Sequence, residues 1–118
     1  MTRPLLSTQQ IAPSALKTIA SFYPDVVQKV AETVQKEKVV IVGMAQNPFV
    51  KKARKALDDA KVPYTYLEYG SYFSQWKQRL AIKLWSGWPT FPQVFLKGQL
   101  IGGCTDLQAL LAKGDVKL

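Results

Sequence analysis

Few side chains in this sequence could perform covalent chemistry. Cys104 is the single cysteine of the 118 residues, and histidine is absent. Without histidine there is no Ser-His-Asp triad, no Cys-His pair and no imidazole ligand for zinc. A single cysteine cannot form an internal disulfide, which is typical of proteins in a reducing compartment. We therefore predict a cytoplasmic protein with no bound metal and no required cofactor.

Cys104 lies near the start of a predicted final helix, where the helix dipole favours the thiolate. That effect contributes only about 0.3–1 kcal/mol at an exposed site, which is less than about one unit of pKa. Asp106, two positions later, disfavours a second negative charge. We expect Cys104 to be mostly a thiol at neutral pH. A packing role is therefore favoured over a redox role.

A second candidate site is the corner Asn47-Pro48-Phe49-Val50, which follows an apolar run of β-branched residues. Asparagine is a favoured N-cap because its side-chain oxygen accepts hydrogen bonds from the first free amides of a helix. Proline suits the first helical position because it has no N–H to leave unpaired. Helix capping accounts for Asn47, and Val50 is small and apolar enough to pack. This corner contains no nucleophile.

Two glycines, Gly102 and Gly103, separate a predicted strand from the final helix. Glycine lets backbone N–H groups turn outward, and a helix N-terminus has unpaired amides and a positive dipole end. Such a terminus accepts a carboxylate or a phosphate. The same glycines could simply make the turn from strand to helix. Both interpretations stay open on this evidence alone.

The formal net charge is +8, and residues 51–55 contain four positive charges. This charge favours anionic partners. Nucleic acid binding would also require a reading motif or a stacking surface, and we identify neither. We therefore predict a solvated basic helix face that steers small anions. The 47% hydrophobic content excludes a disordered chain, and no apolar run is long enough to cross a membrane.

The hydrophobic pattern predicts an α/β protein with a mixed sheet. Helices are expected over Pro13–Lys38 in two pieces with a restart at Pro24, from Asn47-Pro48 to about Ala60, from Ser71 to Gly87, and from Thr105 or Asp106 to about Lys113. Strands are expected at Val39–Gly43, Tyr64–Glu68, Gln93–Leu96 and Gln99–Ile101. The first two strands should be parallel, and the last two should form an antiparallel hairpin.

Three local expectations depend on single residues. Ser14 is expected to cap the first helix, and Thr105 or Asp106 the last one. The residues Phe73, Trp76, Leu80 and Leu84 lie on roughly one side of the helix predicted from Ser71. Most aromatic residues between Tyr64 and Trp88 are expected in the core, although some near Tyr69–Trp76 could form a partner surface.

Three blocks of the sequence carry a resemblance to a known family. They are VVIVGMAQNPFVKKARK at residues 39–55, GWPTFPQVF at residues 87–95 and GQLIGGCTDL at residues 98–107. In these blocks the chain resembles the glutaredoxins over about Gln28 to Val116. The resemblance implies a thioredoxin-like fold with a four-stranded mixed sheet flanked by helices. Residues 1–27 would form an extra N-terminal arm and helix, and residues 28–118 a glutaredoxin-like domain.

The resemblance also implies a glutathione site and a cis peptide bond before Pro92. In this family the backbone of the residue before that proline pairs with the glutathione peptide. The residues after the double glycine hold the γ-glutamyl carboxylate. By this resemblance the glutathione-binding residues would be Phe91, Pro92, Gly103, Cys104, Thr105 and Asp106.

The family's Cys-x-x-Cys motif is missing. Its four positions are Asn47, Pro48, Phe49 and Val50, and the family's lysine shortly before the nucleophile falls at Met44. Thiol–disulfide exchange requires an attacking thiolate, which this corner cannot supply. The iron–sulfur cluster of single-cysteine glutaredoxins is held by that same cysteine, so no cluster is expected.

Three functional hypotheses follow from the sequence. The first is a non-catalytic module that binds glutathione, another γ-glutamyl or peptide-like anion, or a protein segment. The second is a glutathione-dependent thiol–disulfide oxidoreductase that acts through Cys104 alone. The third is an interaction module that binds a protein partner through its basic and aromatic helices.

Overall fold

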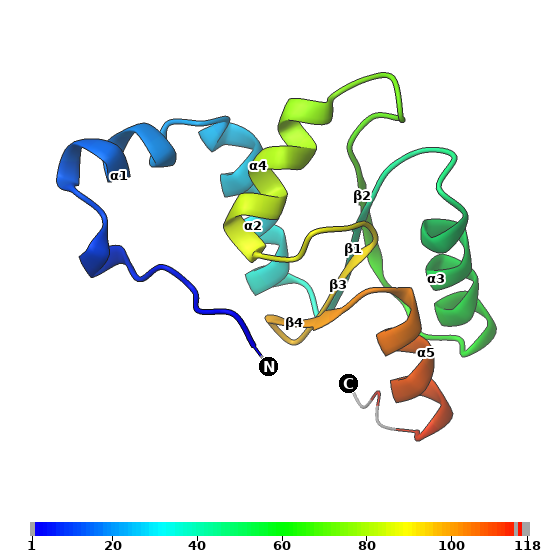
Figure 1. The fold of residues 1–118 in the computed structure, drawn as a ribbon. Helices are drawn as coiled ribbons and strands as arrows, with labels where there is room; N and C mark the ends of the chain where they lie inside the picture. Colours follow the sequence, from blue (N-terminus) through cyan, green and yellow to red (C-terminus); the bar gives the residue numbers. More distant parts are fainter. Residues whose placement is uncertain (1, 115, 117–118) are drawn as a thin grey trace.

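The computed structural model describes residues 2–114 and 116. Its elements follow the predicted alternation of helices and strands (Figure 1). In chain order they are a 3-10 turn Thr8–Gln10, α1 Pro13–Ala20, α2 Pro24–Lys36, β1 Val39–Gly43, α3 Pro48–Asp59, β2 Thr65–Glu68, α4 Trp76–Ser86, β3 Gln93–Leu96, β4 Gln99–Gly102 and α5 Cys104–Ala112.

The four strands form one mixed sheet in the order β2-β1-β3-β4. β1 and β2 are parallel, whereas β1 and β3, and also β3 and β4, are antiparallel. All five residues of β1 are buried. A strand covered by helices on both faces has apolar residues at every position, because both of its sides are buried. This is why Val39–Gly43 could be recognised as a strand in the sequence. The predicted fold class is confirmed.

Two helices cover each face of the sheet (Figure 1). Val40 and Val42 of β1 point toward α2 and α4, in a cluster with Val30 and Ile82. The alternate residues of β1 point toward α3 and α5, where they pack with Leu57 and Leu107. This alternation follows from the two-residue period of a strand. β1 therefore packs against both helix layers.

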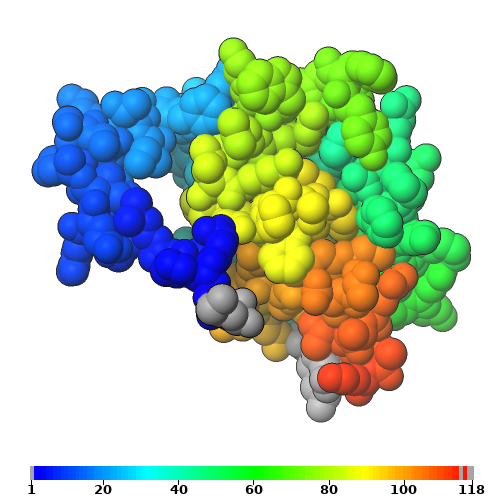
Figure 2. Space-filling view, in the orientation of Figure 1, coloured from blue at the N-terminus to red at the C-terminus, as the bar shows by residue number. Residues whose placement is uncertain are grey.

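The N-terminal segment extends away from this body. No residue of α1 is buried, and of the described residues before it all but the half-buried Ile11 are exposed. Figure 2 shows much of this segment standing apart from the rest of the molecule. The predicted N-terminal helical segment is thus present, while the division between residues 27 and 28 falls within α2 and stays a prediction.

The first two helices begin at prolines, which corrects one predicted cap. The restart at Pro24 is confirmed, and Val30 and Val34 of α2 are buried. Ser14 does not cap α1, because the helix already begins at Pro13. Proline favours the first helical position through its fixed φ, so it sets the boundary one residue before Ser14. Within the described part of the chain, every helix is too short or too polar to cross a membrane.

The predicted start of α4 was wrong. The helix begins at Trp76, and residues 71–74 form a turn in which the Ser74 hydroxyl accepts from the Ser71 amide. Its buried side consists of Arg79, Ala81 and Ile82. The larger apolar residues are exposed, including Phe73 and Trp76, and these two lie in the Tyr69–Trp76 stretch where the sequence left core and partner surface open. The α4 helix packs on α2 through its small and β-branched residues, and this leaves its bulkier side facing solvent.

The last helix also begins earlier than expected. Gly103 is the N-cap residue of α5, so Thr105 and Asp106 lie inside the first turn. Asp106 nevertheless contributes to capping, because its carboxylate accepts the Gly103 amide at 2.9 Å. An acidic side chain in the first turn can reach back to the N-cap amide and also complements the helix dipole.

Candidate functional site

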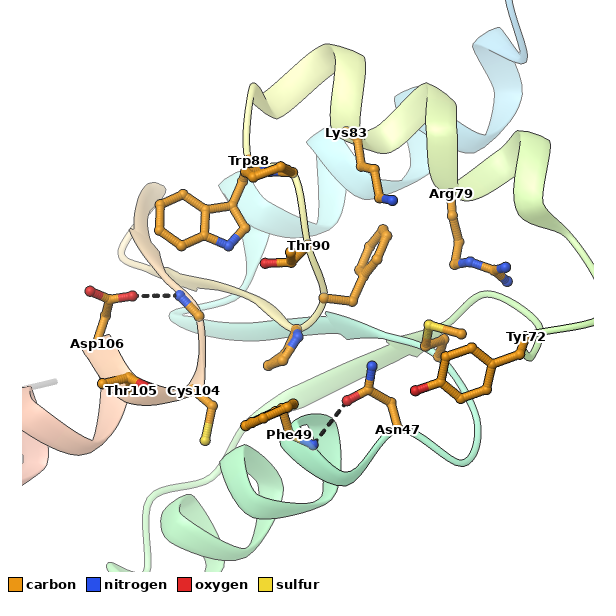
Figure 3. Close-up of a pocket in the computed structure, with 15 residues that line it drawn as sticks. Asn47, Phe49, Tyr72, Arg79, Lys83, Trp88, Thr90, Cys104, Thr105 and Asp106 are labelled. Atoms are coloured by element: carbon orange, nitrogen blue, oxygen red, sulfur yellow. Dashed lines mark hydrogen bonds between the residues drawn. The ribbon is translucent and has the colours of Figure 1, made fainter. Parts of the chain in front are cut away.

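A pocket of about 580 Å³ lies where three segments meet: the start of α3, the loop before β3 and the start of α5. Figure 3 shows these segments around one cavity. The side of α4 that faces this loop completes the wall. The lining includes all six residues predicted for glutathione binding, Phe91, Pro92, Gly103, Cys104, Thr105 and Asp106. The structure thus brings these residues together, and their binding of glutathione stays a prediction.

Asn47 caps α3 at the edge of this pocket. The amides of Phe49 and Val50 donate to Asn47 Oδ1 at 2.9 and 3.1 Å. The predicted cap is therefore confirmed, and the residue is 9% exposed. Because both amides bind the oxygen, the nitrogen of the same side chain must point the other way. Figure 3 shows Asn47 Nδ2 directed into the pocket.

The other residues of the corner have structural or rim positions. Val50 is buried, and a Cβ added at Gly43 would lie 2.8 Å from Val50 Cγ1. Val50 therefore fills the contact between β1 and α3, as its apolar side chain predicts. Pro48 is exposed at the first helical position. Phe49 is exposed at the rim, with Lys52 Nζ 5.5 Å from its ring centroid.

The start of α5 is shaped by Gly102, whose φ is +121°. A Cβ at this position would clash with Asp106 Oδ2. Glycine is therefore required both for the backbone conformation and for the close approach of Asp106. At Gly103 the nearest atom to an added Cβ would be 3.4 Å away, which is ordinary contact. The turn thus depends on the first glycine much more than on the second.

Two cations of α4, Arg79 and Lys83, line the pocket and were missed by the sequence analysis. Arg79 is 7% exposed, and its guanidinium donates to the carbonyl oxygens of Tyr69 and Ser74. Lys83 Nζ lies 5.7 Å from the centroid of the Phe91 ring. Their four-residue spacing places both on one side of α4. That spacing was the available signal, but charged helix positions usually indicate a solvated face.

Cys104 lies at the pocket wall and is buried without a disulfide partner. Burial raises the pKa of its thiol, and the positive charge of Lys52 offsets part of this rise. A raised pKa favours the thiol over the thiolate at neutral pH. This direction agrees with the expectation from the sequence.

The loop before β3 is held by a buried side chain. Gln93 is fully buried, and its Nε2 donates to the Trp88 carbonyl oxygen at 3.0 Å. The Phe91–Pro92 peptide bond between them is cis. Trp88 Nε1 is buried near Gly103 and has no hydrogen-bond partner among the described residues. Buried donors are normally paired, so this indole N–H is an exception in the described part of the chain.

Comparison with known proteins identifies the family and agrees with the fold. The glutaredoxin family model matches residues 39–101. The chain belongs to the glutaredoxin family. It is 51% identical to a glutaredoxin-like protein of Dictyostelium discoideum over 98 residues, which is 83% of this chain and 80% of that protein. It is 41% identical to monothiol glutaredoxin-S17 of Arabidopsis thaliana over 71 residues, which is 58% of this chain and 14% of that longer protein.

A solved glutaredoxin has the same fold. The crystal structure of a buckwheat glutaredoxin–glutathione complex superimposes with a TM-score of 0.67 at 22% sequence identity, covering 79% of this chain and 84% of the buckwheat chain. At this identity the match establishes the thioredoxin-like fold alone.

The family's iron–sulfur cluster does not fit this corner. A cluster ligand here would have to be a thiolate, and the family position holds Asn47. The carboxamide oxygen of Asn47 is occupied by two backbone amides. Among the described residues, no group of three or more histidine, cysteine, aspartate or glutamate side chains could hold a metal ion.

Proposed function

We propose that this glutaredoxin-family protein binds glutathione in the pocket and carries out no thiol–disulfide exchange at the α3 corner. One observation carries this proposal. A buried asparagine caps the helix at the position where exchange would need a thiolate, and the pocket beside it is still formed. Another γ-glutamyl or peptide-like anion, or an extended protein segment, would use the same contacts.

The start of α5 supplies one end of the proposed site. The amides of Cys104 and Thr105 lie in the first turn, where no helical carbonyl is available to them. With the positive end of the helix dipole, they favour a ligand carboxylate. The Asp106 carboxylate lines the same end and would attract the ammonium group of a γ-glutamyl residue. Positive and negative ligand groups are therefore both matched here.

The α4 side supplies the other end. Lys83 and Arg79 place positive charge across the pocket from α5 (Figure 3). Arg79 donates to two carbonyl oxygens, and these carry only partial charge, so its positive charge stays largely uncompensated. A second ligand carboxylate, such as that of a C-terminal glycine, would be stabilised on this side. A tripeptide with a carboxylate at each end fits this distribution of charge.

Between the two ends the pocket contains Asn47, whose amide can bind a ligand but cannot react with it. Asn47 Nδ2 points into the cavity and can donate one hydrogen bond to a ligand acceptor. A carboxamide cannot form a mixed disulfide. Binding at this corner would therefore be reversible and non-covalent.

Cys104 is the basis of the alternative function, thiol–disulfide exchange with glutathione. It lines the same pocket, so a bound disulfide could reach it. The raised pKa of this thiol reduces the thiolate that such an attack needs. We therefore favour binding without exchange. A cytoplasmic location, where a lone thiol stays reduced, is part of the same proposal.

Isothermal titration with reduced and with oxidised glutathione tests the proposal. We expect saturable binding that reverses on dialysis, with amide NMR shifts at Phe91 and Thr105. Lys83→Glu should weaken binding because it places a negative charge beside a ligand carboxylate, whereas Lys36→Glu on α2 should not. No heat and no shift at millimolar ligand would reject glutathione binding. A mixed disulfide in the wild type that is lost in Cys104→Ser would favour the alternative.

A further inference from the structure

The outward side of α4 and the turn before it carry large exposed apolar residues. Phe73 is 95% exposed, Trp76 59%, Leu80 37% and Leu84 65%. Trp76, Leu80 and Leu84 are four residues apart and share one side of the helix. We call these four residues the α4 outward face. Single exposed apolar residues are normal, but a continuous row along one helix is typical of an interaction surface.

This face continues into an apolar groove. Leu84 and the neighbouring Trp85 line a cavity of about 580 Å³ together with Ile19, Phe22 and Val27. These three residues come from the end of α1, the connection and the first turn of α2, which we call the α1–α2 elbow. Figure 1 places α4 beside α2 with α1 farther out, and Figure 2 shows open space between the N-terminal segment and the rest of the molecule. The apolar surface is therefore convex along α4 and concave at its end.

The segments that form this surface carry more positive than negative charge. From Tyr69 to Thr105 the sequence contains Lys77, Arg79, Lys83 and Lys97 and no aspartate or glutamate. From Thr2 to Gln28 it contains Arg3 and Lys17 and a single acidic residue, Asp25 in the first turn of α2. Lys77 lies beside the apolar row, with its Nζ 5.6 Å from the Trp76 ring. An acidic partner would complement this face.

We infer that the α4 outward face and the adjoining groove bind an acidic amphipathic helix of a partner protein. Apolar side chains of such a helix would lie along Trp76, Leu80 and Leu84, because rows with four-residue spacing pack against each other. One of them would enter the groove beside Trp85. Acidic side chains on its flanks would approach Lys77 and Lys17.

Two other occupants fit this surface less well. A second copy of the chain would bring the same lysines against one another, which disfavours pairing of two such faces. An anionic membrane would match the charge and the exposed aromatic residues. A lipid surface, however, does not insert a side chain into the concave groove between α4 and the α1–α2 elbow.

The inference is independent of the glutathione pocket, although the two sites meet at Lys83, which lines the pocket. The variants that test the face therefore leave Lys83 unchanged. Leu80, Leu84 and Lys77 do not line the pocket. Their substitution should leave glutathione binding as it is in the wild type.

A designed helical peptide of about 18 residues is a suitable probe. It carries leucine at every third or fourth position on one side and glutamate on its flanks. We expect saturable binding in amide NMR, with the largest shifts at Trp76, Leu80 and Leu84. Leu80→Glu and Leu84→Glu should each weaken binding about tenfold. Leu5→Glu, a matched change of an exposed leucine on the N-terminal arm, should have no effect.

Charge variants provide the second arm of the experiment and remain informative if a leucine variant fails to fold. A version of the peptide with lysine in place of glutamate should bind about tenfold more weakly. Lys77→Glu should weaken binding of the acidic peptide, and Lys36→Glu on α2 should not. Equal binding of the two peptides, or acidic-peptide binding that is unchanged in Leu80→Glu, Leu84→Glu and Lys77→Glu, would overturn the inference.

The competing occupants are measured with the same variants. Co-sedimentation with phosphatidylserine-containing vesicles that requires Leu80 and Leu84, without peptide binding, would replace the partner helix by a membrane. A wild-type dimer that becomes monomeric in Leu84→Glu would replace it by a second copy. Either result would contradict the inference.

Discussion

Two helix N-termini face the same pocket, and they differ in whether their first backbone amides are free to bind a ligand. At the start of α3, Asn47 accepts the amides of Phe49 and Val50, so the protein itself satisfies this terminus. At the start of α5 the N-cap is Gly103, which has no side chain to offer, and the first-turn amides there lack such a cap. We call the α3 terminus closed, because a side chain of the protein caps its amides, and the α5 terminus open.

Under the proposed function, the difference separates a terminus that could hold a reactive thiolate from a terminus that binds an anion. A thiolate at the α3 terminus would be stabilised by the same amides and dipole that now bind an asparagine. Replacing sulfur by a capping carboxamide keeps the helix in place and removes the nucleophile. Under the proposal, anion binding then belongs to α5 and to the cations of α4. The following predictions test this division.

The largest expected effect is a loss of stability from a substitution at the open terminus, the start of α5. Gly102→Ala should lower the free energy of unfolding by about 1–3 kcal/mol, because φ is +121° and the new Cβ would meet the Asp106 carboxylate. Urea unfolding measures this loss, and glutathione binding should weaken with it. Gly98→Ala is the matched control, since its φ is also positive but nothing lies near the added Cβ. Equal losses in both variants would contradict a specific role of the Asp106 contact.

At the closed terminus, Asn47→Ala should cost about 0.5–2 kcal/mol of stability because it removes the cap. Asn47→Asp keeps an acceptor for the two amides and should retain most of that stability. Thermal unfolding of the two variants separates capping from packing. If Asn47→Asp were as unstable as Asn47→Ala, the cap would not be the source of the stabilisation.

A smaller loss of stability is expected for Asp106→Asn, because the substitution weakens the hydrogen bond that the Asp106 side chain accepts from the Gly103 amide. Removing a charge from the first turn of a helix changes stability by about 0.3–1 kcal/mol. The effect should shrink as salt is added, because exposed charges are screened. Urea unfolding at low and high salt measures it. A loss that does not depend on salt would assign the effect to packing.

The smallest effect concerns the pH dependence of Cys104. Burial raises the pKa of this thiol above its ordinary value, so alkylation should become fast only at higher pH than for a free cysteine. Lys52→Ala should shift this profile further upward, and Lys51→Ala should not. Because the folded pKa is the higher one, the thiol stabilises the folded state at neutral pH. This contribution is lost as pH rises through the folded pKa. Alkylation that is already fast at neutral pH would contradict the raised pKa.

Much of the framework could be predicted because local chemistry and tertiary structure agree. β1 is an uninterrupted apolar run because both of its faces are covered. The α3 cap follows from Asn47-Pro48 alone. The six pocket residues of the β3 and α5 region came from the family resemblance, since no spacing rule brings Phe91 next to Thr105.

The orientation of α4 could not be predicted from its sequence. The helix has apolar residues on two sides, and periodicity does not indicate which side is buried. Packing against α2 selects the side with Ala81 and Ile82, and the row from Trp76 to Leu84 becomes exposed. Arg79 and Lys83 were missed for the same reason, because a helix must be oriented before its charges can be assigned to a pocket.

The most direct test of the closed α3 terminus is the rate at which a glutathione mixed disulfide is reduced by Asn47→Cys and by the wild type. A cysteine at position 47 would face the pocket from the start of α3, so we predict exchange in the variant and none in the wild type. Wild-type exchange as fast as that of the variant would contradict the account, and so would a correctly folded Asn47→Cys that binds glutathione but shows no exchange.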